Sequence, residues 1–191
     1  GSATVTKVGN GLPAGSVFQV QINTSTPDTM YAAVGTNGIY RSTDGGLNFS
    51  ARNNGLSTPL SSGLSARYLA MAPSNSNKLI VTFKEGFGRN LYYTNDGGGS
   101  WTQTTDMDEK NADGWVAGSV FGYTNNLSGI MGSNAPIAFH PTVQNIALTS
   151  GWGDQIKKTI DGGVTWKYSN TGYTGAMAGQ VASVSPIGWD P

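Results

Sequence analysis

The chain has 191 residues, of which 37% are hydrophobic and only 12% are charged, about half the usual charged share. Eleven lysines and arginines balance eleven aspartates and glutamates, and no run of like charges occurs, so we expect no nucleic-acid partner. The chain has no cysteine and one histidine, which excludes thiolate chemistry and multi-histidine metal sites. We therefore expect no cofactor and no metal, and any catalysis would depend on carboxylates.

The composition predicts an all-β fold. The chain contains 28 glycines and many Ser, Thr and Asn residues, and apolar residues do not recur at helical spacing. No segment approaches the roughly 18 consecutive apolar residues of a membrane helix, so we expect no membrane contact. Low charge with abundant hydroxyl and amide side chains is typical of secreted proteins, and we expect a secreted or extracellular location.

Short apolar strands occur in three successive sets along the chain. The expected strands are 20–22, 30–34 and 39–41 in the first set, 69–71, 79–83 and 91–93 in the second, and 137–139, 146–148 and 156–158 in the third. Turn residues separate the first two strands of each set. This regular order indicates an internal repeat.

The same octet follows the third strand of every set. It covers residues 42–49, 94–101 and 159–166, and it contains a hydroxyl residue, an Asp, two glycines and an aromatic residue five positions after the Asp. The Asp residues are Asp44, Asp96 and Asp161, and the aromatic residues are Phe49, Trp101 and Trp166. An Asp that accepts backbone N–H bonds, followed by Gly-Gly with positive φ, predicts a hairpin turn with the aromatic ring beneath it. We expect these Asp residues to be structural.

Each set with its octet predicts a four-stranded antiparallel meander, A-B-C-D, with the Asp in the C–D turn. The spacing from Ile22, Met71 or Phe139 on strand A to the Asp is 22, 25 or 22 residues. Four-stranded units of this size are typical of β-propeller blades.

The two ends of the chain align with parts of a blade. Residues 6–12 align with the strand D exit at 50–56, and residues 187–191 align with strand A at 137–141. The predicted organisation is the last strand of a preceding blade (1–14), blades at 15–57, 58–106 and 135–172, an inserted loop (107–134), and the start of a further blade (173–191). Three complete blades are fewer than the about four to eight of a closed ring, so we expect further blades from the same gene product or from other chains.

The octet resembles the Asp-box, or bacterial neuraminidase repeat, and the blade rhythm resembles the xyloglucanase-like glycoside hydrolases of family 74 and sortilin-type receptors. The resemblance implies a propeller that is either carbohydrate-active or a receptor. In the segment 36–41, Asn37 stands where the hydrolase family has a catalytic Asp. An amide cannot act as that base, so we expect this blade not to be the catalytic one.

In such a meander the A–B and C–D turns lie at one edge, and the B–C and D–A connections lie at the other. The second edge would therefore gather the inserted loop and two B–C connections, which together carry carboxylates and aromatic rings. The candidates for sugar binding are Trp152, Trp115, Tyr123, Glu85 and Arg89. Asp154, beside Trp152, is the candidate catalytic acid or base.

Two further features have plain interpretations. Asp106, Asp108 and Asp113 suggest calcium, but Lys110 occupies a ligand position of the EF-hand pattern. His140 aligns with Ala72 before a Pro in the A–B turn, so it is expected to be a turn residue.

Two hypotheses about function remain. The chain is expected to be a segment of a secreted, glycoside-hydrolase-like propeller that acts on a β-glucan or xyloglucan type polysaccharide through carboxylate acid/base chemistry. The alternative is a non-catalytic extracellular propeller that binds a protein or glycan partner.

Overall fold

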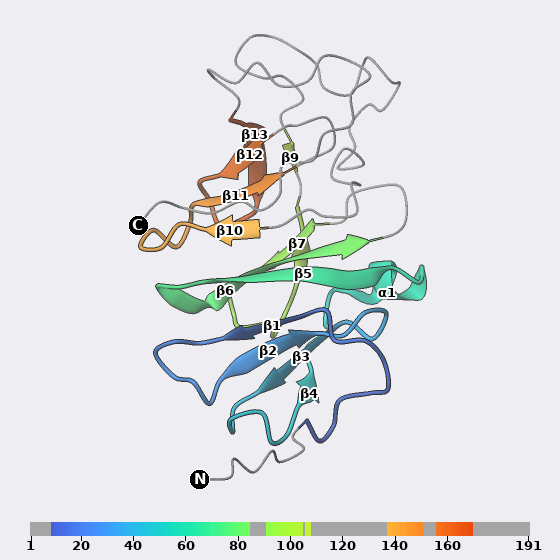
Figure 1. Cartoon of the computed structure of the whole chain (residues 1–191). Helices are drawn as coiled ribbons and strands as arrows, with labels where there is room; N and C mark the ends of the chain where they lie inside the picture. Colours follow the sequence, from blue (N-terminus) through green and yellow to red (C-terminus); the bar gives the residue numbers. More distant parts are fainter. Residues whose placement is uncertain (1–8, 85–90, 105, 108–136, 151–155, 170–191) are drawn as a thin grey trace.

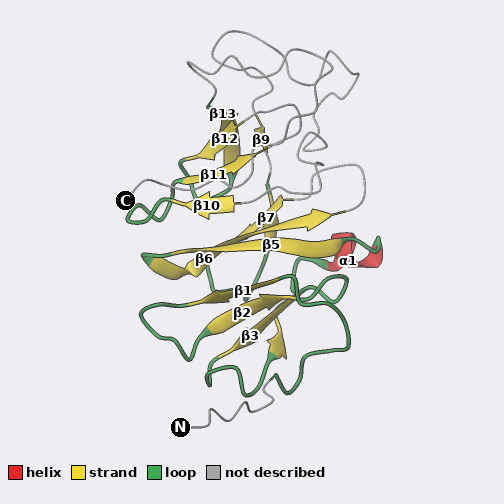
Figure 2. Ribbon diagram, viewed as in Figure 1, coloured by secondary structure: helices red, strands yellow, loops and turns green. Residues whose placement is uncertain are grey.

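The structure is a computed structural model that describes residues 9–84, 91–104, 106–107, 137–150 and 156–169. The described residues form thirteen strands and one helix of five residues, α1 (Ser57–Ser61). Strands dominate the fold, as Figure 2 shows, so the all-β prediction is confirmed.

The strands form three sheets, which follow one another in chain order in Figure 1. The first blade contains β1 (Gln19–Ile22), β2 (Met30–Ala33), β3 (Ile39–Ser42) and β4 (Ser50–Ala51). The second contains β5 (Ser65–Ala72), β6 (Asn75–Lys84), β7 (Leu91–Thr94) and β8 (Thr102–Gln103). The third contains β10 (Ile137–Phe139), β11 (Ala147–Ser150), β12 (Ile156–Thr159) and β13 (Thr165–Tyr168), with β9 (Asp106–Met107) added at its edge.

Within each blade, consecutive strands pair antiparallel, which confirms the predicted four-stranded meanders of an incomplete propeller. Equivalent positions pair in register: Met30 faces Ser42 in the first blade, and Leu79 faces Thr94 in the second. The predicted residue limits of the blades and of the inserted loop remain predictions.

The hydrophobic core lies between the sheets. One cluster joins Tyr31, Ala33 and Ile39 of the first blade to apolar side chains of the second, including Leu69 and Val81. A second cluster joins the opposite face of the second blade to the third, and the indole of Trp166 is fully buried in it. Each blade therefore depends on its neighbours for burial of its apolar faces.

Two elements were absent from the sequence prediction. Helix α1 occupies the connection from β4 to β5, where Pro59 lies in its first turn, a position that proline tolerates because the N–H has no partner there. The short strand β9 pairs parallel with β13, through Asp106 opposite Thr165 and Met107 opposite Trp166. The chain leaving the second blade thus runs along strand D of the third blade before the predicted inserted loop.

Candidate functional site

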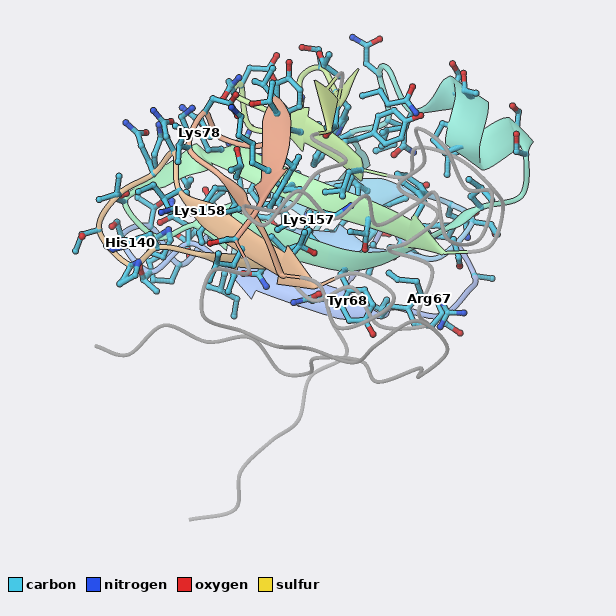
Figure 3. The ribbon with its side chains drawn as sticks, turned by 90° about the horizontal axis from the view of Figure 1, so that it is seen from above. Arg67, Tyr68, Lys78, His140, Lys157 and Lys158 are labelled. Atoms are coloured by element: carbon cyan, nitrogen blue, oxygen red, sulfur yellow. The ribbon has the colours of Figure 1, made fainter. Side chains whose placement is uncertain are left out.

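The blades have two edges, one formed by the A–B and C–D turns and the other by the B–C and D–A connections. At one edge, each C–D turn is hydrogen-bonded to the A–B turn of its own blade or, in the second blade, to the start of β6. Three equivalent bonds do this: Gly45 N to Asp28 O (3.0 Å), Gly97 N to Asn77 O (2.9 Å) and Gly162 N to Asn145 O (2.9 Å). In Figure 3, Lys78 and His140 lie toward one side of the view and Arg67 toward the other. Side chains at the two edges therefore cannot contribute to one site.

The C–D turn of the first blade shows how its Asp is held. The Oγ of Ser42 donates to Asp44 Oδ1 at 2.8 Å and accepts the N–H of Gly46 at 2.9 Å. The backbone N–H of Asn48 donates to the same Oδ1 at 2.9 Å, and its side-chain amide donates to Oδ2 at 2.8 Å. Both carboxylate oxygens are therefore used within the turn.

The other two C–D turns repeat this arrangement. The hydroxyl-to-carboxylate distances are 2.6 Å from Thr94 to Asp96 and 2.7 Å from Thr159 to Asp161. The backbone N–H groups that reach these carboxylates belong to Ser100 (2.9 Å) and Thr165 (3.0 Å), and the hydroxyls of the same two residues donate to the second oxygen. The three C–D turns therefore share the same pattern of local hydrogen bonds.

These bonds lower the pKa of each turn carboxyl. The backbone and side-chain N–H groups of Asn48, with the hydroxyl of Ser42, bring the pKa of Asp44 to about 2. Burial by itself would raise the pKa of Asp96, but hydrogen bonds from Thr94 and Ser100 outweigh it and bring that pKa to about 2. Burial would raise the pKa of Asp161 too, but hydrogen bonds from Thr165 and Thr159 outweigh it and lower that pKa. Carboxyls whose pKa is lowered in this way carry no proton to donate near neutral pH.

An Asn-Gly-Leu segment lies next to two of the three octet aromatic residues. The N–H of Phe49 donates to Asn10 O at 2.7 Å, and the N–H of Trp101 donates to Asn54 O at 2.9 Å. The indole N–H of Trp101 also donates to Arg52 O at 2.7 Å. In the sequence, the two Asn-Gly-Leu segments align with each other as strand exits. Their repetition was the available signal for this contact between blades.

The opposite edge carries the B–C connections. In the first blade, Asn53 Oδ1 accepts the N–H of Ile39 at 2.7 Å, and Asn53 Nδ2 donates to Asn37 O at 2.9 Å. The side-chain amide of Asn37 donates to Ala14 O at 3.2 Å. An ionised carboxylate could not donate this bond, so the amide at position 37 suits a structural tether.

The strand ends also fix where the other B–C connections leave. In the third blade Ser150 pairs with Ile156 at the ends of β11 and β12. The guanidinium of Arg67 lies over the Phe18 ring, 3.8 Å from its centroid, at the start of β5.

All six sequence-predicted site residues lie outside the described residues. They are Trp115, Tyr123, Glu85, Arg89, Trp152 and Asp154. Asp108 and Asp113 of the calcium alternative also lie outside them, and of Asp106 the structure describes the backbone pairing in β9.

His140 acts as a turn acceptor. Its Nδ1 accepts the N–H groups of Thr142 and Val143, both at 3.2 Å, which requires the proton on Nε2. Among the residues that the structure describes, no group of three or more His, Asp or Glu side chains gathers to hold a metal ion. Within the same residues, no helix has the length and apolar character needed to cross a membrane.

No family model and no curated protein matches the chain. Among solved structures, an ancestral GH74 enzyme is similar with a TM-score of 0.55 at 19% identity, over 79% of this chain. YCF48 from Cyanidioschyzon merolae is similar with a TM-score of 0.55 at 18% identity over 82% of this chain, and YCF48 bound to D1 peptide with 0.52 at 18% over 81%. At such identities the similarity establishes the propeller fold alone.

The chain is much shorter than these similar proteins. It spans 18% of the GH74 enzyme, 41% of YCF48 from Cyanidioschyzon merolae and 39% of the peptide-bound YCF48. The activities and partners of the longer proteins therefore bear on this chain only as proposals.

Proposed function

We propose that this chain is a section of a secreted, glycoside-hydrolase-like propeller that binds a β-glucan or xyloglucan type polysaccharide at the B–C/D–A edge. The observation that carries the proposal is the contrast between the edges. At the C–D edge every Asp of the repeated turn already accepts hydrogen bonds on both oxygens. That edge has no carboxylate left for a substrate among the three turns, whose pattern we assign to the Asp-box.

The B–C edge has the connections that a sugar site needs. In the chain, residues 85–90 follow β6 and precede β7, and residues 151–155 follow β11 and precede β12, in neighbouring blades. These connections carry Glu85, Arg89, Trp152 and Asp154 in the sequence. Aromatic rings would stack on the sugar, and Asp154 would act as acid or base with a second carboxylate about 5–10 Å away. That second group would come from the inserted loop or from a further blade.

The second candidate function is a non-catalytic propeller that binds a protein or glycan partner. One observation favours it: a similar propeller, YCF48, has been solved bound to D1 peptide. In the first blade the tether made by Asn37 also shows that a B–C connection can be purely structural.

Binding and turnover of xyloglucan oligosaccharides separate the two. We expect Trp152→Ala to weaken binding about tenfold, because an aromatic ring stacked on a sugar is lost. We expect Asp154→Asn to retain binding and to lose hydrolysis. Leu47→Ala is the matched control, since Leu47 is an exposed apolar side chain at the C–D edge.

Oligosaccharide binding without hydrolysis in the parent chain would favour the glycan-binding form of the second candidate. A parent chain that binds no oligosaccharide would contradict the proposal and leave protein binding. If Leu47→Ala weakened oligosaccharide binding as much as Trp152→Ala, the site would not lie at the B–C/D–A edge, and the proposal would be contradicted.

A further inference from the structure

The outer face of the first blade, which points away from the second blade, is apolar and exposed. Val20 and Ile22 on β1 are 47% and 52% exposed. They share this face with Met30 and Tyr40, because Val20 pairs with Ala32, Ile22 with Met30, and Ala32 with Tyr40. Four apolar side chains thus lie on one face of a sheet and are at most partly buried.

The repeat shows what this face resembles. Counted from the turn Asp, the row Val20, Ala32 and Tyr40 is equivalent to the row Leu69, Val81 and Tyr92 of the second blade. In the second blade this row is buried: Leu69 is 1% exposed, Val81 0% and Tyr92 5%. The outer positions of the row therefore differ between the two copies: Val20 is exposed and Tyr40 half-buried where Leu69 and Tyr92 are covered, while Ala32 is buried like Val81.

The cover on the second blade is the first blade. Tyr31, Ala33, Ile39 and Leu56 pack against the Leu69 row in one core cluster. The hydroxyl of Tyr31 donates to Gly97 O at 3.1 Å, and Gln19 Oε1 accepts the N–H of Leu69 at 3.0 Å. A blade face with an aromatic, a small and an aliphatic residue, plus an amide on strand A, thus complements this surface.

One part of the same interface is already in place on the first blade. Asn10 N donates to Leu47 O and Asn10 O accepts from Phe49 N, at 2.9 and 2.7 Å. The equivalent Asn54 accepts from Trp101 where the first and second blades meet. Leu12 is half-buried, whereas its equivalent Leu56 is fully buried between two blades. The segment that crosses between blades is present, and the side chains that would complete the contact are exposed.

We propose that the Val20/Ile22 face is a docking surface for a further four-stranded blade of this repeat. The contact face of that blade carries residues of the kind found at Tyr31, Ala33 and Ile39. A blade is the expected occupant because the equivalent face of the second blade is covered by the first blade. Docking of a blade here does not depend on sugar binding. Burial of this face would remove Val20 and Ile22, the apolar side chains of β1, from water.

The test uses a tandem duplication of residues 13–56 within the full chain. The chain has no cysteine, so Val20→Cys in one copy gives a single thiol to follow with a labelling reagent, at the position equivalent to Leu69, which is 1% exposed beneath the first blade. In the second copy this thiol faces the added blade and should react about tenfold more slowly or less, since labelling then needs local opening. In the first copy it should react as fast as in the unduplicated chain.

Two controls keep the result specific. Ile160→Cys, at a turn residue that is 68% exposed, should react at the same rate with and without the duplication. Tyr31→Ser with Ile39→Ser in the first copy only should restore fast labelling in the second copy, because the complementary face is lost.

Either of two results overturns the proposal. One is a thiol at position 20 that reacts equally fast in both copies of the folded, duplicated chain. The other is protection in the unduplicated chain that grows with protein concentration, which would make a second copy of this chain the occupant.

Discussion

Replacing Gly55 by alanine tests how tightly the blades are joined. Gly55 has φ +88, and a Cβ there would collide with the backbone oxygen of Trp101 in the next blade. The neighbouring Asn54 O accepts the N–H of Trp101 at 2.9 Å, and the indole N–H of Trp101 reaches Arg52 O at 2.7 Å. The collision therefore falls on the contact that joins the two blades.

The expected cost has two parts. A non-glycine residue at positive φ costs about 1–2 kcal/mol. Moving the Trp101 backbone away weakens two hydrogen bonds, which contribute about 0.5–1.5 kcal/mol each. We expect Gly55→Ala to lower the free energy of unfolding by about 2–5 kcal/mol.

Gly63→Ala is the matched control. Gly63 has φ +73 and lies in the same connection, but a Cβ there would have nothing within 4 Å. It should cost only the backbone part, about 1–2 kcal/mol. Urea unfolding followed by tryptophan fluorescence measures both variants. Equal destabilisation by the two substitutions would refute the close approach of the blades at Gly55.

Three further predictions follow from the C–D turns and the blade contact. Asp161→Ala should destabilise by about 1–3 kcal/mol in urea unfolding, because it leaves N–H groups of the turn without an acceptor, and an unchanged midpoint would refute the role of this carboxylate. The pKa values of Asp44 and Asp96 are about 2 in the folded chain against 3.8 without these bonds, so their stabilisation is complete above about pH 4 and is lost as the pH falls toward 2. Urea midpoints between pH 7 and 2 would show this loss, and it should shrink when both residues are changed to Asn. Tyr31→Phe should cost about 0.5–1.5 kcal/mol, because the hydroxyl bond to Gly97 O at 3.1 Å is removed, and calorimetry would show a lower Tm.

The sequence predicted the strands and the C–D turns because their interactions are local. Ser42, Asp44, Gly46 and Asn48 bond to one another within seven residues, so the octet contains the whole turn. Short runs of apolar residues likewise located β2, β6 and β11 without knowledge of their neighbours.

The tertiary structure decided how the blades are joined, since those contacts link residues far apart in the chain. Trp101 bonds to Arg52 and Asn54, and β9 pairs with β13 about sixty residues later, which no local pattern encodes. It also decided which apolar faces are covered. Val20 and Leu69 occupy equivalent positions and have similar side chains, yet one is 47% exposed and the other 1%, because burial depends on the neighbouring blade rather than on the residue itself.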